Sequence, residues 1–134
     1  MKLINSKMHG ILDYVLVFML SIAPYMFNLD EESIHCRVLM VTGLLLLLVS
    51  LLTDFEFFLI KVFTLKTHLI IDILLGIFLV TSPFTFDLSG RSIVPHIVLG
   101  IAIISVSLFT KTTKESVEVS EIQEDLQNDM ITQD

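Results

Sequence analysis

The stretch KMHGILDYVLVFMLSIAPYMFNL, at residues 7–29, is followed 59 positions later by KTHLIIDILLGIFLVTSPFTFDL, at residues 66–88. A chain rich in leucine and isoleucine would match itself at some apolar positions through composition alone. It would not match lysine, histidine, aspartate and proline in the same order. The two stretches share all four, as Lys7 and Lys66, His9 and His68, Asp13 and Asp72, and Pro24 and Pro83. The sequence therefore predicts an internal repeat.

The repeat extends into a second apolar run. After a two-residue deletion in the second copy, the chain matches itself at a shift of 57 positions. We expect each unit, about residues 7–53 and about residues 66–110, to be a helical hairpin of two spans. Two spans return the chain to its starting side, so the copies should be parallel, with a pseudo-two-fold axis along the membrane normal. The later matches are Gly43 with Gly100, Val49-Ser50-Leu51 with Val106-Ser107-Leu108, and Thr53 with Thr110.

Composition places the chain among membrane proteins. Of its 134 residues, 54% are hydrophobic and only 17% are charged, and the mean hydropathy is +0.83. An ordinary globular protein has about 25% charged residues, and a chain this short cannot bury so much apolar surface inside itself. These values exclude a disordered chain, a nucleic-acid binder and a disulfide-rich secreted domain, and they argue against a soluble enzyme.

Four apolar stretches have the length of membrane spans. A helix needs about 20 residues to cross a hydrocarbon core of about 30 Å, and a backbone in lipid must satisfy its own hydrogen bonds. We therefore predict an all-α polytopic membrane protein, with four transmembrane helices arranged as two parallel-repeat helical hairpins in a domain at residues 1–110. The spans run from about 8–29, 33–53, 67–86 and 92–110.

Two segments lie outside these spans. Residues 111–134 hold two lysines and seven acidic residues of a chain whose net charge is -7, and we predict an acidic cytoplasmic tail without stable structure. The alternative is a tail helix that docks on a partner through a weak apolar stripe. Residues 54–63 mix aromatic and charged side chains. They either lie in the cytoplasmic interface or extend the neighbouring spans into the headgroups.

The distribution of lysine predicts the orientation of the chain. All six lysines fall on one side of the four spans, and the two arginines, Arg37 and Arg91, fall on the other. The positive-inside rule then places both termini in the cytoplasm. We expect a multi-pass protein of the cell's inner (plasma) membrane. The lysines are Lys2, Lys7, Lys61, Lys66, Lys111 and Lys114.

The candidate functional residues are two His-x3-Asp pairs near the cytoplasmic ends of the first and third spans. In a helix, residues four apart lie on one face, about 6 Å apart along the axis. The repeat places both pairs at the same depth, so they would converge near the bundle axis if the two spans face each other. This candidate polar cluster consists of His9, Asp13, His68 and Asp72.

The chemistry of this cluster has three interpretations. In the favoured one, the groups are structural and bond each other, cap backbone groups or tie the two spans together. In the second, they form a proton or ion pathway. The third, a divalent metal site, is disfavoured because no third ligand type lies nearby in the sequence. The sequence thus predicts no catalytic residue, no cofactor and no metal site.

A resemblance to a known family is carried by two tripeptides and by the start of the first copy. Ala23-Pro24-Tyr25 and Ser82-Pro83-Phe84 resemble the Ser-Pro-Trp signature of the SPW-repeat family of small integral membrane proteins. The segment Lys7-Met8-His9-Gly10-Ile11-Leu12-Asp13-Tyr14 is similar to the start of its two-repeat members. The resemblance covers residues 7 to about 110 and implies a four-helix prokaryotic membrane protein without an established activity. Each proline should bend the last turn of its span.

From these features we expect a non-enzymatic membrane protein with a structural or accessory role. A proton or ion pathway through the His-Asp pairs is the alternative. A membrane enzyme or redox subunit is disfavoured because cofactor ligands are missing. The expected partners are the lipid bilayer, a further copy of the chain or another membrane protein, and not nucleic acid.

Overall fold

The computed structural model describes residues 3–53, 64–87 and 90–110, together with position 127. Four long helices account for most of this part, and each is long and apolar enough to cross a membrane. The prediction of an all-α multi-pass membrane protein is therefore confirmed, with span limits within a few residues of those expected. The helices are α1 (Ser6–Met26), α2 (Ile34–Leu51), α3 (Leu65–Thr85) and α4 (Ile93–Leu108), with a short 3-10 turn, η1 (Gly90–Ser92), before α4.

The first and third helices begin and end at equivalent positions of the repeat. Asn5 caps α1 and Thr64 caps α3, and each side chain accepts a hydrogen bond from the backbone N–H three residues later, at 2.8 and 3.3 Å. Such caps satisfy backbone donors that have no partner inside the helix. Beyond the helices, Asn28 and Asp87 both take a φ of 51°, a conformation that Asn and Asp tolerate better than most residues. The repeat is thus present in the backbone as well as in the sequence.

The two motif prolines lie inside the last turns of their helices. Pro24 and Pro83 are buried, and each helix continues for two more residues. The aromatic residues that follow them face outward, with Tyr25 64% and Phe84 78% exposed. An outward position in the last turn explains how Tyr and Phe occupy equivalent places, because neither ring has to fit a fixed space in the core.

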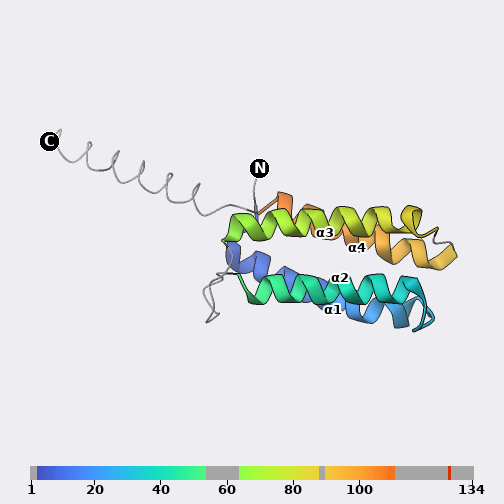
Figure 1. Cartoon of the computed structure of the whole chain (residues 1–134). Coiled ribbons are helices and arrows are strands. Elements are labelled where there is room, and N and C mark those ends of the chain that lie inside the picture. Colours follow the sequence, from blue (N-terminus) through green and yellow to red (C-terminus); the bar gives the residue numbers. More distant parts are fainter. Residues whose placement is uncertain (1–2, 54–63, 88–89, 111–126, 128–134) are drawn as a thin grey trace.

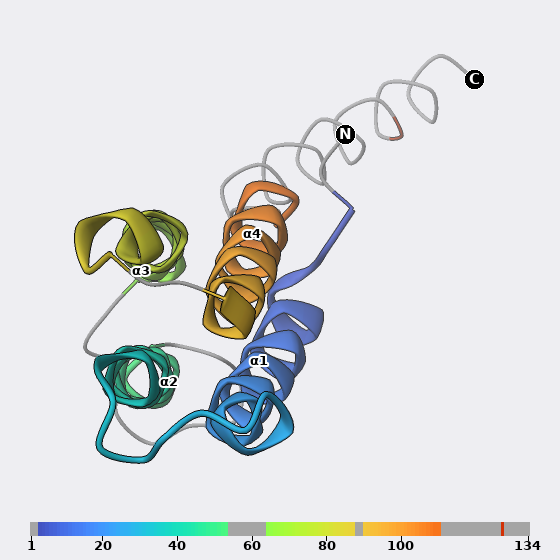
Figure 2. The same cartoon turned by 90° about the vertical axis from the view of Figure 1, so that its right-hand side faces the viewer.

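The four helices stand in chain order at the corners of a square (Figure 2). Each helix packs against the next one in the chain, and α4 also packs against α1. The starts of α1 and α3 lie at the same end of the bundle as the ends of α2 and α4 (Figure 1). The hairpins α1–α2 and α3–α4 are therefore parallel copies, as the repeat predicts. Helices α1 and α3 face each other along one diagonal.

The first residues of the chain that the structure describes close the bundle at this end. The backbone N–H groups of Leu3 and Ile4 both donate to the carbonyl of Phe109, at 2.9 and 3.0 Å. These bonds fix the start of α1 beside the end of α4. The equivalent contact for α3 would involve residues 54–63, which lie outside the described residues.

The bundle exposes apolar side chains and encloses polar ones. Ile11, Phe18 and Leu74 are 64%, 60% and 61% exposed, which suits helices surrounded by lipid and would be unfavourable in water. A short apolar core occupies the middle of the bundle. It is formed by Leu16, Leu20, Ala23, Val38, Leu39, Leu46, Leu79 and Ile103. Most of the buried histidine, aspartate, serine and threonine side chains belong to the outer turns of the helices or to the residues beside them, and Thr42 is buried in the middle of α2.

Glycine allows α3 and α4 to approach closely. A Cβ placed on Gly100 would lie 2.9 Å from the carbonyl oxygen of Gly76 and 3.0 Å from the backbone nitrogen of Val80. Backbone atoms cannot move aside as a side chain can. In the other hairpin, a Cβ on Gly43 would meet only side-chain atoms closer than 3.9 Å, the nearest being Leu20 Cβ at 3.2 Å. Small residues are the usual means of such close packing in membranes.

We predict that Gly100→Ala destabilises the bundle more than Gly43→Ala. The first substitution forces two helix backbones apart and should lower the free energy of unfolding by about 1–3 kcal/mol. The second brings the new Cβ to 3.2 Å from Leu20 Cβ, a contact that a shift of a few tenths of an ångström relieves, so its cost should stay below about 1 kcal/mol. Unfolding by SDS in mixed detergent micelles measures both values. Equal losses from the two variants would contradict the close approach of α3 and α4.

Candidate functional site

The structure brings the two His-Asp pairs together, as expected from their equal depth in the repeat. His9 and Asp13 belong to α1, and His68 and Asp72 belong to α3, which stands at the opposite corner of the bundle (Figure 2). All four side chains are buried, with at most 1% of each residue exposed. The cluster therefore lies on the bundle axis and is closed to water and lipid.

Each imidazole of the cluster contacts both carboxylates through its Nε2 atom. His68 Nε2 lies 2.8 Å from Asp13 Oδ2 and 3.0 Å from Asp72 Oδ2. His9 Nε2 lies 3.2 Å from Asp72 Oδ2 and 3.4 Å from Asp13 Oδ2. The two rings stand edge to face, with their centres 5.1 Å apart. Two of the four contacts join one hairpin to the other.

The remaining two helices supply a serine to each carboxylate. Ser50 of α2 donates to Asp13 Oδ2 at 3.1 Å, and Ser107 of α4 donates to Asp72 Oδ2 at 3.2 Å. These bonds lie within a hairpin and occupy equivalent positions of the repeat. Each Oδ2 atom thus has three polar neighbours, which lessens the cost of burying the carboxylate.

A threonine just beyond the end of α2 or α4 contacts each histidine from the opposite hairpin. Thr53 Oγ1 lies 2.7 Å from His68 Nδ1, and Thr110 Oγ1 lies 3.0 Å from His9 Nδ1. Each hydroxyl also donates to a carbonyl of its own helix, at 2.7 and 2.6 Å. A hydroxyl has a single proton to donate, so both threonines accept a hydrogen bond from an imidazole Nδ1–H.

The internal repeat includes these four hydroxyl residues, but the sequence alone does not indicate their role. Ser50 matches Ser107 and Thr53 matches Thr110 in the repeat. Hydroxyl side chains in helices often bond only to their own backbone, as Thr42 does here at 2.8 Å, so a serine or threonine in a span does not by itself indicate a polar site. The one feature that could have indicated their role is that all four recur, together with the His-Asp pairs, in both copies of the repeat.

The cluster has the composition and size of a metal-binding group. One possible ligand atom from each of the four residues lies within 4.8 Å of the other three. The sequence disfavoured a metal site because no third ligand type lies nearby in the sequence. The convergence of α1 and α3 instead brings two His-Asp pairs together, and each of the four side chains also has an outer hydrogen bond.

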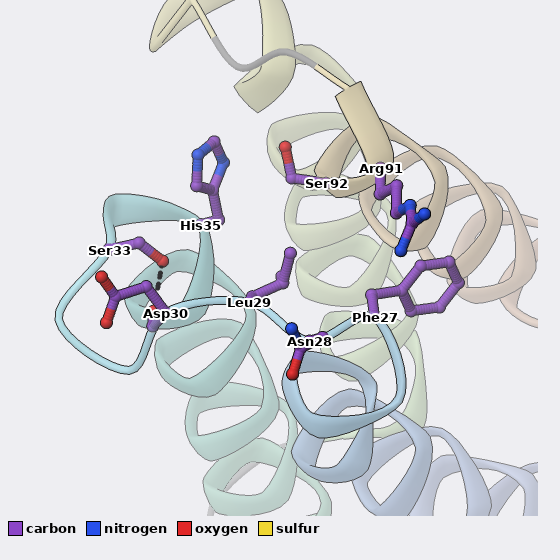
Figure 3. Close-up of a pocket in the computed structure, with 8 residues that line it drawn as sticks. All are labelled: Phe27, Asn28, Leu29, Asp30, Ser33, His35, Arg91 and Ser92. Carbon is purple, nitrogen blue, oxygen red and sulfur yellow. Dashed lines mark hydrogen bonds between the residues drawn. The ribbon is translucent and has the colours of Figure 1, made fainter.

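The opposite end of the bundle carries two further histidines. His96 is buried in α4 and donates from Nδ1 to the carbonyl of Ser92 at 2.6 Å, while its ring stands edge to face with His35 of α2, with centres 6.4 Å apart. Figure 3 shows His35 at a cavity of about 330 Å³ between the two inter-helix turns. His96 matches Leu39 in the repeat, so the repeat does not produce a second histidine pair of this kind. The cavity is lined by Phe27, Asn28, Leu29, Asp30, Ser33, His35, Arg91 and Ser92.

Two predictions concern segments outside the described residues. The acidic tail at 111–134 and the possible interfacial segment at 54–63 fall almost entirely in this part of the chain. Both stay predictions.

Comparison with known proteins gives one match. No curated protein and no solved structure matches the chain. The sequence model of the SPW repeat domain matches residues 7–110, which include both hairpins and the whole polar cluster. The match covers well over half of the chain and agrees with the repeat in the sequence and in the backbone, and the chain therefore belongs to the SPW repeat family.

Proposed function

We propose that this protein is a non-enzymatic structural or accessory unit of the membrane, in which the polar cluster joins the two hairpins. The observation that carries this proposal is the exchange of polar contacts between the hairpins. His9 contacts Asp72 and Thr110, and His68 contacts Asp13 and Thr53. Neither hairpin satisfies its own histidine alone, so the pairing of the hairpins is built into the cluster.

Burial of the cluster supports a structural role over catalysis. Its four members have at most 1% of their surface exposed, and their polar atoms face each other. A catalytic group needs to reach a substrate atom within hydrogen-bond distance or through one water. These side chains instead hold α1 and α3 at a fixed separation, while the serines hold α2 and α4 on them.

A proton or ion pathway is the second candidate function. The observation that favours it is the convergence of four buried ionisable side chains from α1 and α3. Ionisable residues inside membrane spans often line such pathways. A pathway would also need a route from the cluster to the other end of the bundle, and the apolar core, which includes Leu20, Leu39 and Leu46, occupies the space between.

For the environment, we propose the plasma membrane with both termini in the cytoplasm. The described lysines Lys7 and Lys66 lie at the end of the bundle that carries the cluster, and Arg37 and Arg91 lie at the other end. The exposed apolar surface makes the lipid bilayer the first partner. A second copy or another membrane protein fits an accessory role.

Asp13→Asn should destabilise the bundle if the cluster joins the hairpins. Loss of one charge from a buried, hydrogen-bonded group leaves its partners uncompensated, and the free energy of unfolding should fall by about 3 kcal/mol. Unfolding by SDS in mixed micelles provides the measurement. Asp87→Asn is the matched control, because Asp87 is exposed and its repeat counterpart is already Asn28. A loss no larger than that of the control would refute the joint.

Proton flux into liposomes separates the structural role from the pathway. The purified protein and its Asp13→Asn/Asp72→Asn double variant are reconstituted with a pH-sensitive dye inside, and an inward proton gradient is applied. The structural proposal expects equal flux from both, at the level of empty liposomes. Faster flux through the wild-type protein that the double variant abolishes would establish the pathway instead.

Reporter fusions test the orientation. A reporter placed near Glu31 and one placed near Lys114 should report opposite compartments, with the latter cytoplasmic, because the lysine-rich side stays in the cytoplasm. An enzyme active only outside the membrane and a fluorophore active only inside give complementary signals. Matching compartments for the two sites would contradict an arrangement of four spans with a cytoplasmic C-terminus.

A further inference from the structure

The hydrogen bonds around the polar cluster determine where the histidine protons lie. The hydroxyls of Thr53 and Thr110 each donate to a backbone carbonyl and therefore accept from an imidazole Nδ1–H. A neutral histidine carries one ring proton. With that proton on Nδ1, the Nε2 atoms of His9 and His68 present lone pairs to the carboxylate oxygens of the cluster.

Four lone-pair atoms then face one another in the core. They are the Nε2 atoms of the two histidines and the Oδ2 atoms of the two aspartates, with four N–O separations between 2.8 and 3.4 Å. Two ionised carboxylates in such a place need two positive charges to offset their burial. Two protons supply them, and so does one divalent cation.

The geometry favours one cation over two protons. A proton lies on the line between one nitrogen and one oxygen, so two protons serve two of the four contacts well. Here every nitrogen approaches both oxygens, and every oxygen approaches both nitrogens. A single ion at the centre would bond to all four atoms at once.

We propose that His9, Asp13, His68 and Asp72 bind one divalent first-row transition-metal ion of the zinc type, which bridges the two hairpins. This inference rests on the proposed role of the cluster as the joint between them, and it names the ligand of that joint.

The four nitrogen–oxygen separations of the cluster are close to those around such an ion. Bonds of about 2.0–2.2 Å place the ligands of a tetrahedral zinc ion about 3.3–3.5 Å apart. The contacts of His9 Nε2, at 3.2 and 3.4 Å, are close to this spacing. Those of His68 Nε2, at 2.8 and 3.0 Å, would have to lengthen by up to about half an ångström, on the scale set by the same bond lengths.

The outer hydrogen bonds are those that metal ligands usually have. A metal-bound histidine donates its other ring N–H to a fixed acceptor, and bound carboxylates are themselves hydrogen-bonded. In this bundle Thr53 and Thr110 accept from the histidines, while Ser50 and Ser107 donate to the aspartates. All four helices or their immediate C-terminal residues thus contribute to holding the ligands.

The donor atoms select the class of metal. Two imidazole nitrogens and two carboxylate oxygens suit zinc and neighbouring divalent ions such as Fe²⁺ and Ni²⁺. Ca²⁺ takes six to eight oxygen ligands, and Mg²⁺ demands octahedral oxygen coordination and retains water. A buried site with two nitrogen donors and four ligands in all disfavours both.

Direct binding of zinc tests the proposal. The full chain is purified in mild detergent, stripped with EDTA and titrated with zinc sulfate, and bound metal is measured after gel filtration. We expect one zinc per chain and a rise in the unfolding temperature, with neither effect from magnesium or calcium at the same concentration. X-ray absorption should show a first shell of nitrogen and oxygen at about 2.0–2.1 Å without sulfur.

Variants assign the binding to the cluster. The Asp13→Asn/Asp72→Asn double variant should lose zinc, whereas Asp87→Asn and Cys36→Ser should retain one equivalent. The Thr53→Val/Thr110→Val double variant retains all four ligands and the shape of the side chains, so it should fold. It should bind zinc about 10- to 100-fold more weakly, because the imidazoles lose the acceptors that orient them.

Three results would overturn the metal site: no retained zinc in the wild-type chain, equal zinc in the wild type and the double aspartate variant, or a sulfur atom in the first shell. Unchanged zinc affinity in the threonine variant would equally contradict it. If the wild-type chain binds no zinc but Asp13→Asn still destabilises the bundle, the metal site is refuted and the role of the cluster in joining the hairpins is retained. The two proposals can therefore be refuted independently.

Discussion

Two carboxylates buried in a membrane-spanning bundle impose the strictest condition on this fold. An ionised aspartate away from water is costly unless charge and hydrogen bonds surround it. Asp13 and Asp72 meet this condition only where histidines and serines from all four helices converge. A displacement of any one helix would remove a partner from a buried polar group, so the cluster fixes the relative positions of the helices more strictly than the apolar core does.

The parallel orientation of the repeat follows from the same condition. In a parallel repeat, equivalent residues lie at equal depth, and both His-Asp pairs reach one point on the axis. An inverted repeat would place the pairs at opposite ends, each with half of its partners. Lipid provides no hydrophobic force between helices. Close packing, such as that of Gly76 on Gly100, holds helices together within a hairpin, and polar contacts of the cluster join one hairpin to the other.

Much of this arrangement could be predicted from one sequence. Span lengths gave the four helices, and the matched polar residues gave the parallel hairpins and the shared depth of the cluster. The roles of Ser50 and Thr53 could not be predicted, because a repeat shows which positions are equivalent but not which are neighbours. The cross-hairpin bond from His68 to Thr53 depends on the placement of α2 beside α3. The His35–His96 contact joins positions that do not correspond in the repeat, so no sequence pattern indicated it.

Comparison of the two copies of the repeat supports the view that the polar cluster constrains the sequence. The buried His9, Asp13, Ser50 and Thr53 are each identical in the second copy, whereas the exposed Phe18 corresponds to an exposed Ile77. A lipid-facing position requires only an apolar side chain, and several residue types satisfy it. The cluster positions require a particular donor or acceptor at a particular distance, because each hairpin completes the histidine of the other. A change in one copy would leave an unsatisfied polar group in each hairpin, which explains why these polar residues are the same in both copies.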